Sequence, residues 1–197
     1  ELISNLHEVA GTGAPFAQRH DLVFVGGFRH PPNLDAMEWF IGDVFPHIRA
    51  ALPQVRLHCI GAGAPDTLLA LAATQPGVVM HGFVEDIVPY MDGARIAIAP
   101  LRFGAGVKGK INLSMAHGQP VVGTTCAVEG MHLRAGQDVL VADDATGFAD
   151  AVVRLYQDPV LWQQLAAAGL ANVAEHFSLD AASATVRVIG PMTSVLL

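Results

Sequence analysis

Short apolar segments alternate with segments of helical periodicity along most of the chain. Runs of consecutive apolar residues predict buried strands, and they lie at 22–25, 55–60, 78–81, 95–99, 120–123 and 139–141. In the intervening segments apolar residues recur every third or fourth position, which predicts helices at 33–48, 66–73, 85–91, 110–117, 144–155 and 158–173. Asn33 is expected to cap the first helix, and Pro46 is expected to kink or shorten it.

Short apolar strands that are separated by helices predict a parallel sheet with both faces covered. The expected fold is α/β, a Rossmann-like doubly wound parallel sheet of about six strands with helices on both faces. We assign residues 21–190 to this domain, 1–20 to a linker or strap from a preceding domain, and 191–197 to a tail. Ligands bind beyond the carboxyl ends of the strands in such sheets, which points to the loops at 26–33, 61–65, 82–86, 100–109 and 124–131.

Composition narrows the range of functions. Hydrophobic residues make up 52% of the 197 residues and charged residues only 15%, so we expect another domain to cover one face. The net charge of −7 disfavours nucleic acid as a partner, because binding to nucleic acid needs clustered Lys and Arg that neutralise phosphates. The apolar runs are too short for a transmembrane segment. Cys59 and Cys126 are far apart in sequence, which fits a reducing, cytoplasmic location.

The segment P-L-R-F-G-A-G-V-K-G-K-I-N, at 100–112, carries most of the candidate chemistry. It joins a predicted strand to a predicted helix, and its glycines allow the backbone to approach a ligand closely. Free N–H groups at a helix start favour an anion. The segment also holds three cations, Arg102, Lys108 and Lys110. This combination predicts a site for a phosphate or diphosphate, and the alternative is a surface turn with solvated lysines.

Two other phosphate-binding patterns match the same loop. Gly104, Gly106 and Gly109 form G-x-G-x-x-G, but the dinucleotide fingerprint belongs in the first βαβ unit of a fold. Gly104 with Gly109-Lys110 forms G-x-x-x-x-G-K, but Ile111 stands where nucleoside triphosphatases carry Ser or Thr for Mg²⁺. A dinucleotide oxidoreductase and a P-loop nucleoside triphosphatase are therefore disfavoured.

Metal and hydrolase chemistry have weaker support. The nine histidines show no metal-ligand spacing beside carboxylates, so neither a metal nor another cofactor is expected. Cys126 lies in a predicted binding loop, but no histidine near it in sequence is placed to activate it as a nucleophile.

A set of ordered motifs resembles the C-terminal, donor-binding domain of retaining GT-B glycosyltransferases of family 4 (group 1). The motifs are F-V-G-G-F-R-H-P-P-N at 24–33, H-G-F-V-E-D at 81–86, A-I-A-P-L-R-F-G-A-G-V-K-G-K at 97–110, M-A-H-G-Q-P-V-V-G-T at 115–124 and A-V-E-G-M at 127–131. The resemblance covers about residues 20–190, and its 97–131 block is the most specific part. It implies one half of a GT-B fold that binds a nucleotide-diphosphate sugar without a metal.

The resemblance also implies residue roles. Gly26 and Gly27 are expected to approach the diphosphate or the donor sugar, and the backbone at Phe83 and Val84 to contact the nucleobase. The cations and main-chain N–H groups of one loop are expected to hold the diphosphate: Arg102, Gly104, Gly106, Val107, Lys108 and Lys110. Such cations and a helix N-terminus stabilise a leaving diphosphate electrostatically.

The chain departs from the family pattern at two positions. Family 4 usually carries two glutamates in the pattern E-x7-E, one at the donor sugar and one at the ribose hydroxyls, and here these positions are Ala105 and Leu113. Losing a charge-assisted hydrogen bond costs about 1.5–3 kcal/mol, or roughly ten- to a hundred-fold in affinity. Asn112, Ser114 and Glu129 are the candidates that would compensate. No catalytic residue is identified.

Two hypotheses about function follow. In the first, the chain is the donor-binding domain of a glycosyltransferase that transfers sugar from a nucleotide-diphosphate sugar to a glycan acceptor in cell-envelope or surface polysaccharide synthesis. An N-terminal acceptor domain of the same polypeptide would complete the enzyme, so the isolated domain is expected to be inactive. In the second, the chain is a degenerate, non-catalytic module that keeps the fold without the E-x7-E glutamates.

Overall fold

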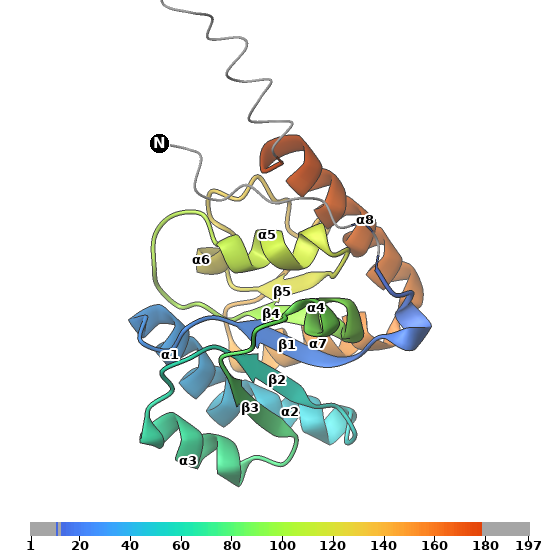
Figure 1. Cartoon of the computed structure of the whole chain (residues 1–197). Helices are drawn as coiled ribbons and strands as arrows, with labels where there is room; N and C mark the ends of the chain where they lie inside the picture. The colour runs from blue at the N-terminus through green and yellow to red at the C-terminus, as the bar shows by residue number, and fades with distance from the viewer. Residues whose placement is uncertain (1–10, 12, 179–197) are drawn as a thin grey trace, which may run out of the picture.

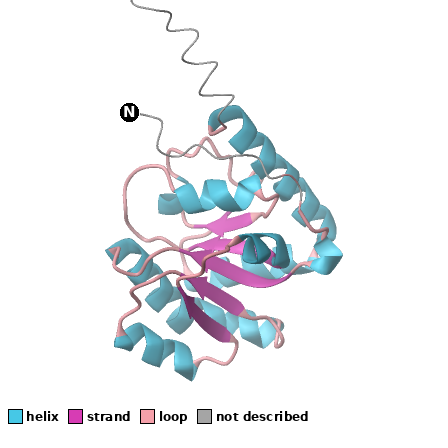
Figure 2. Cartoon of the chain, in the orientation of Figure 1, coloured by secondary structure: helices cyan, strands magenta, loops and turns pink. Residues whose placement is uncertain are grey.

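The chain forms a six-stranded parallel sheet between two layers of helices in a computed structural model that describes residues 11 and 13–178 (Figures 1 and 2). The strands are β1 His20–Val25, β2 Leu57–Ile60, β3 Val78–Gly82, β4 Ala94–Ala99, β5 Val121–Gly123 and β6 Leu140–Val141. The helices are α1 Pro31–Trp39, α2 Phe45–Ala51, α3 Asp66–Thr74, α4 Val88–Gly93, α5 Gly109–Ala116, α6 Thr125–Val128, α7 Ala145–Gln157 and α8 Pro159–His176, with a 3₁₀ turn, η1, at Phe16–Gln18.

The strand order is β3-β2-β1-β4-β5-β6, and every pairing is parallel. This is the doubly wound order in which the chain reverses direction across the sheet between β1 and β4. The predicted fold class is confirmed. The expected strands lie within one or two residues of the observed ones, because each is a buried run of apolar residues that the parallel pairing requires.

Two hydrophobic cores lie on opposite faces of the sheet. The larger one joins alternate residues of the strands, such as Leu22 and Phe24, to α1, α2, α3 and α7. The smaller one joins the opposite residues, such as Val23 and Ala97, to α4, α5, α6 and the end of α8. This alternation follows from the period of two in a strand, and it explains why the strands read as continuous apolar runs.

The first helical region differs from its predicted form at both ends. His30, and not Asn33, is the N-cap residue, because Pro31 and Pro32 occupy the first two helical positions, where proline costs little. Asn33 is therefore inside the first turn, where its side chain is buried. At the other end α1 passes through a π-helical turn, η2 Phe40–Val44, into α2, with Pro46 in the first turn of α2. The predicted disturbance at Pro46 is confirmed, since a residue without an N–H cannot continue an α-helical ladder.

Two smaller elements also differ. The helix expected at 85–91 begins at Val88, where Asp86 Oδ1 accepts the Val88 N–H at 3.0 Å. The sequence did not predict α6, which follows β5 directly and is capped by the Thr124 hydroxyl. Its four residues are too few to show a helical period.

Residues 13–19 pack along the amino edge of the sheet, away from the edge where ligands are expected. Arg19 is fully buried there, and its guanidinium donates to the carbonyls of Ala14 at 2.7 Å, Met91 at 2.7 Å and His117 at 2.9 Å. These bonds fix the described part of the predicted 1–20 strap to its own domain. The remainder of that segment, and the predicted tail at 191–197, lie outside the described residues.

Candidate functional site

The turns that follow β1 and β4 meet at the carboxyl edge of the sheet, where the strand order reverses. Gly26 and Gly27 follow β1, and the glycine-rich loop at 100–108 follows β4. β1 and β4 are hydrogen-bonded neighbours, so residues 74 positions apart in sequence, such as Val23 and Ala97, come together there. In open α/β sheets this reversal point forms the ligand crevice.

Gly26 has no room for a side chain. A Cβ atom at this position would lie 2.7 Å from Asn33 Nδ2 and 2.8 Å from Lys110 Nζ. At Gly27, in contrast, the nearest atom to an added Cβ would be 3.9 Å away, and the residue is exposed. Gly26 is therefore packed from below by two polar side chains, and Gly27 faces outward at the crevice.

Lys110 is a half-buried cation of this site. Its ammonium donates to Asn33 Oδ1 and lies 4.4 Å from the centre of the Phe24 ring, and Asn33 Nδ2 in turn donates to the Gly27 carbonyl at 2.8 Å. Burial, together with the charge of Lys108, lowers the pKa of Lys110 to about 7. An amine with this pKa is about half protonated at neutral pH, and an anion placed beside it would favour the charged form.

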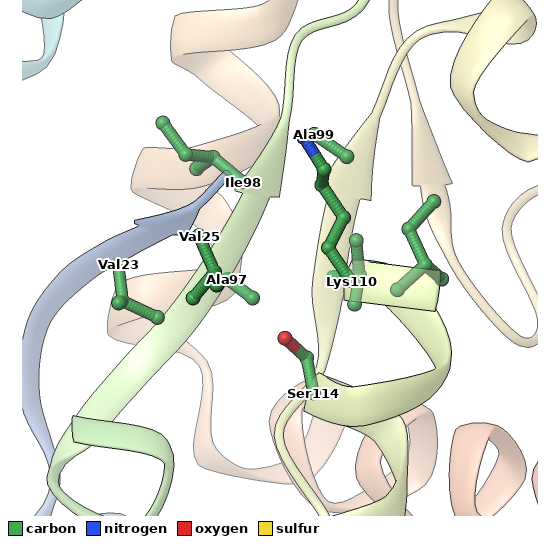
Figure 3. A pocket seen from close by; sticks show the side chains of 9 residues that line it. Val23, Val25, Ala97, Ile98, Ala99, Lys110 and Ser114 are labelled. Atoms are coloured by element: carbon green, nitrogen blue, oxygen red, sulfur yellow. The ribbon is translucent and has the colours of Figure 1, made fainter. Parts of the chain in front are cut away.

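Lys110 and Ser114 line a small cavity beside β1, β4 and β5, and Figure 3 shows the lysine extending past Ala99 with the serine hydroxyl one turn below. The cavity has a volume of about 10 Å³, which is room for about one water molecule. Residues four apart in a helix share a face, so this face of α5 carries the polar groups that are directed toward the sheet.

The loop at 104–108 is folded back on its own lysine. Lys108 is 9% exposed, and its Nζ donates to the carbonyls of Gly106 at 2.6 Å and Gly104 at 3.2 Å. Gly104 and Gly106 have φ values of 122° and 80°, which only glycine adopts without strain. The α5 N-terminus that follows has Lys108 as its N-cap residue, whose side chain does not cap the helix. Val107, which packs partly into the smaller core, completes the loop.

Arg102 lies elsewhere. Its guanidinium forms two hydrogen bonds with the Asp35 carboxylate of α1, one of them from Nε at 2.9 Å, and lies 5.7 Å from the centre of the Trp39 ring. Hydrogen bonding to Asp35 raises the pKa of Arg102. Lys108 and Lys110 therefore lie close together, at the end of the loop and in the first turn of α5. Arg102, in contrast, binds Asp35 and connects the loop to α1.

The predicted nucleobase loop follows β3. Phe83 is 76% exposed, and Val84 is half-buried against the smaller core. Gly82, with φ of 69°, turns the chain sharply at this point. Both residues lie at the carboxyl edge of the sheet, as expected for their assigned role.

The residues proposed to replace the missing glutamates are in different environments. Asn112 is fully buried, and neither of its amide atoms has a hydrogen-bond partner among the described residues. It lies about 200° around α5 from Lys110, so it is directed away from the crevice and does not fit the compensating role. Ser114 is buried beside the small cavity, and Glu129 is exposed. Ala105 is exposed and Leu113 is half-buried in the smaller core.

Several residues that organise the site were not predicted from sequence. Asn33 joins Gly27 to Lys110, Asp35 holds Arg102, and Cys126 Sγ lies 3.5 Å from the Gly104 carbonyl oxygen. The Thr124 hydroxyl donates to the Leu101 carbonyl and accepts the Ala127 N–H at 3.1 Å, which connects the loop after β4 to α6. Asn33 does carry a sequence signal, as a polar residue directly after Pro-Pro, but that pattern predicts a helix cap and not a contact with the site.

Two features are absent from the described part of the chain. Residues 13–178 contain no group of three or more His, Cys, Asp or Glu side chains that could hold a metal ion. None of the helices in that range is long and apolar enough to cross a membrane.

Comparison with known sequences places this architecture among sugar transferases. The sequence model of the family described as "Glycosyl transferases group 1" matches residues 19–158. A relative from Klebsiella pneumoniae, named "Uncharacterized 44.6 kDa protein in cps region", is 27% identical over 140 residues, which are 68% of this chain and 36% of the relative. The chain thus spans little more than a third of that relative's length.

Solved structures have the same fold at low sequence identity. TarM of S. aureus, solved as a mutant in complex with UDP and other ligands, matches with a TM-score of 0.77 at 13% identity, over 95% of this chain and 39% of its own. Anabaena Alr3699/HepE, in complex with UDP and glucose, matches with a TM-score of 0.70 at 13% identity, over 89% and 49%. The C-terminal domain of a group 1 glycosyl transferase (LpcC) from Francisella tularensis matches with a TM-score of 0.66 at 15% identity, over 81% and 87%.

Proposed function

The chain belongs to the group 1 glycosyltransferases, and on that premise we propose that it is the donor-binding half of a retaining, family 4 enzyme that transfers sugar from a nucleotide-diphosphate sugar. The observation that carries the proposal is the pairing of Lys110 with Asn33 directly beneath Gly26, at the reversal point of the sheet. A half-buried amine, a glycine that allows close approach and a helix N-terminus are together suited to one chemical group, a diphosphate.

The chemistry of the site supports a transferase that works without a metal. When a sugar leaves a nucleotide, negative charge develops on the departing diphosphate, and fixed cations or dipoles at that point lower the barrier. In this proposal, Lys110 and the N–H groups at the start of α5 would stabilise that charge. Lys108, which holds the loop carbonyls of Gly104 and Gly106, would shape the backbone around the diphosphate.

The nucleobase is assigned to the loop at 82–87 and the first candidate base is uracil. Phe83 offers an exposed ring at the carboxyl edge of β3. Two proteins with this fold, TarM and Alr3699/HepE, were solved with UDP. We therefore place UDP first among the nucleotides to be tested.

We assign the acceptor to a glycan of a cell-envelope or surface polysaccharide. A relative is named for a cps region, and this chain spans 36% of that relative. This chain also matches 87% of the C-terminal domain of LpcC. The match supports a donor-binding half that works with an N-terminal acceptor domain. We place the enzyme in the cytoplasm, in keeping with the free thiols of Cys59 and Cys126.

A second function, that of a non-catalytic module, rests on Ala105 and Leu113. These positions lack the two family glutamates, and Asn112 is turned into the protein. Under this hypothesis the A105E/L113E variant gains donor affinity, whereas under the first hypothesis wild-type protein already binds it. Calorimetry with the same nucleotide sugar compares the two proteins directly.

The main experiment is calorimetric titration of the 197-residue chain with UDP, GDP, TDP and their common sugars at millimolar ligand. Saturable binding of one base, weakened by Lys108→Ala, supports a working donor site. Absence of binding across the panel, together with absence of transfer by a longer protein that contains this chain, refutes the proposed function.

A further inference from the structure

Four polar side chains from four elements form a continuous hydrogen-bonded relay beside the nucleobase loop. Tyr90 Oη of α4 lies 3.3 Å from His81 Nδ1 of β3, and His81 Nε2 lies 2.9 Å from His58 Nδ1 of β2. His58 Nε2 lies 3.2 Å from Asp21 Oδ2 of β1. None of these residues belongs to the diphosphate site. We refer to them as the histidine relay.

Asp21 fixes the direction of the relay. Its other oxygen, Oδ1, accepts the Arg56 N–H at 2.9 Å, and its own N–H donates to the Tyr156 hydroxyl at 3.1 Å. Burial acts to raise the pKa of Asp21, but the hydrogen bonds from His58 and from the Arg56 backbone lower it overall. Asp21 is therefore an ionised acceptor at the end of the relay. Its φ of 64° is tolerated by aspartate better than by most residues.

The partners dictate the tautomers of the neutral relay. His58 Nε2–H donates to Asp21, which leaves His58 Nδ1 as an acceptor for His81 Nε2–H. His81 Nδ1 is then an acceptor for the Tyr90 hydroxyl. Every nitrogen is satisfied, and all the protons point from Tyr90 toward Asp21.

The relay responds differently to one proton and to two. One proton added to the histidine pair reverses two of the three bonds, so that His58 Nδ1–H donates to His81 Nε2 and His81 Nδ1–H donates to the Tyr90 oxygen, while His58 Nε2–H still donates to Asp21. A second proton places two N–H donors against each other across 2.9 Å, and this contact cannot remain a hydrogen bond. Burial, and then the charge of His58, lower the pKa of His81, in keeping with a second proton that is taken up only in acid.

The relay also holds both ends of the loop that carries Phe83. His81 precedes this loop and Tyr90 follows it, and the bond between them joins residues nine positions apart. The rings of these two residues are in edge-to-face contact, with centroids 4.8 Å apart. Among the described residues, Arg56, Arg95 and Tyr156 also act on the relay by charge or hydrogen bond, all through Asp21.

We propose that the histidine relay is a proton-sensitive clamp that positions the loop at 82–87 and so sets the affinity for the nucleobase. The assignment of that loop to the nucleobase rests on the proposed function, whereas the clamp itself rests on the relay geometry alone. His81 and Tyr90 are positioning residues in this scheme, and they do not touch the reacting atoms. The clamp is closed with no proton or one proton on its histidine pair. With two protons the His58–His81 hydrogen bond is lost, so the His81 ring loses its support from β2 and its bond to Tyr90 is weakened.

The clamp is tested first without ligand, by amide hydrogen exchange of the 197-residue chain at pH 7.5 and pH 5. The amides of Tyr90 and Met91 donate to the Ile87 carbonyl and report on the start of α4, and the Ala97 amide, bonded to Pro120 O, reports on global unfolding. Protection at Tyr90 and Met91 is expected to fall at least about five-fold in acid while that of Ala97 is retained. H58Q, which is neutral at both pH values, is expected to remove this response, and H47Q, at an exposed histidine of α2, is the matched control that keeps it.

Y90F keeps the ring and removes the hydroxyl. It is expected to lower the protection of the two α4 amides about three- to ten-fold already at pH 7.5. Equal protection in Y90F and wild type, or an acid response that Ala97 shares, would overturn the clamp.

The link to the nucleobase is tested with UDP and inorganic pyrophosphate at pH 7.5. Y90F is expected to weaken UDP about three- to ten-fold and pyrophosphate less than about two-fold. Equal weakening of both would show that the clamped loop does not serve the base. If wild-type protein binds neither ligand, the result counts against the proposed donor site for UDP, and the exchange experiment still decides whether the clamp exists.

Discussion

Replacing Lys110 with Met is expected to weaken UDP binding and to abolish a proton uptake that accompanies it. The ammonium lies beneath Gly26 at the predicted diphosphate site, and its removal deletes one charge-assisted interaction. Such an interaction is worth about 1.5–3 kcal/mol, so affinity should fall roughly ten- to a hundred-fold. Met keeps a similar length and apolar character, which limits the loss of packing.

The size of the proton uptake follows from the pKa of Lys110, which is about 7 in the free protein. At pH 8 roughly a tenth of the lysine is protonated, and a diphosphate that raises the pKa by about 2 would leave about nine tenths protonated. Binding at pH 8 should therefore take up about 0.8 protons, and binding at pH 6 only about 0.1. UDP itself contributes little at pH 8, because a terminal phosphate with a pKa of about 6 is already ionised.

Calorimetry in two buffers of different ionisation enthalpy measures this uptake directly. Wild type is expected to show it at pH 8. Lys110→Arg, which keeps the charge and does not titrate in this range, is expected to bind without it. A wild-type uptake near zero, or an equal uptake in Lys110→Met, would refute the assignment of Lys110 to the diphosphate.

Three further predictions concern stability, each measured by urea unfolding. Gly26→Ala should lower the free energy of unfolding by about 1–3 kcal/mol, because its Cβ would meet Asn33 and Lys110 at under 3 Å. Gly27→Ala, with nothing closer than 3.9 Å, should change it by less than about 0.5 kcal/mol. Similar losses in both variants would contradict the close packing at Gly26. Asn112→Leu should raise stability by about 1–2 kcal/mol, because a buried amide without partners is replaced by an apolar group of similar size, and a loss would mean that the amide is satisfied. Because the pKa of Lys110 is lowered from 10.5 to about 7, the unfolded chain binds more protons between these values, so the stability of wild type relative to Lys110→Met should rise with pH by up to about 1.3 kcal/mol per unit. A flat difference would place the amine in water.

Much of the fold could be predicted because its signals are local. Strands such as Ala94–Ala99 are buried on both faces and therefore read as apolar runs, and α7 and α8 begin close to their predicted starts, where Asp144 and Asp158 cap them. The edge of the sheet at which the candidate loops gather could also be predicted, since the carboxyl edge of a parallel sheet is fixed by topology. Local reasoning failed for α6, which is too short to show periodicity, and at Asn33, where two prolines moved the helix start.

Contacts between distant residues could not be predicted from one sequence. Lys110 and Asn33 are 77 positions apart, and Arg102 and Asp35 are 67 apart. These pairings separate the three cations of the segment at 100–112. Lys108 and Lys110 lie at the crevice, whereas Arg102 binds to α1. The histidine relay has the same character, because β1, β2 and β3 align its members only after the sheet has formed.

The most direct test of the central claim is a crystal structure of this chain with a bound nucleoside diphosphate. The account predicts the diphosphate over Gly26 and Gly27, within hydrogen-bond distance of the first N–H groups of α5 and close to Lys110 Nζ, with the base beside Phe83. A nucleotide bound at another edge of the sheet would contradict the account. So would a diphosphate that is bound by Arg102, after its release from Asp35, and that makes no contact with Lys110.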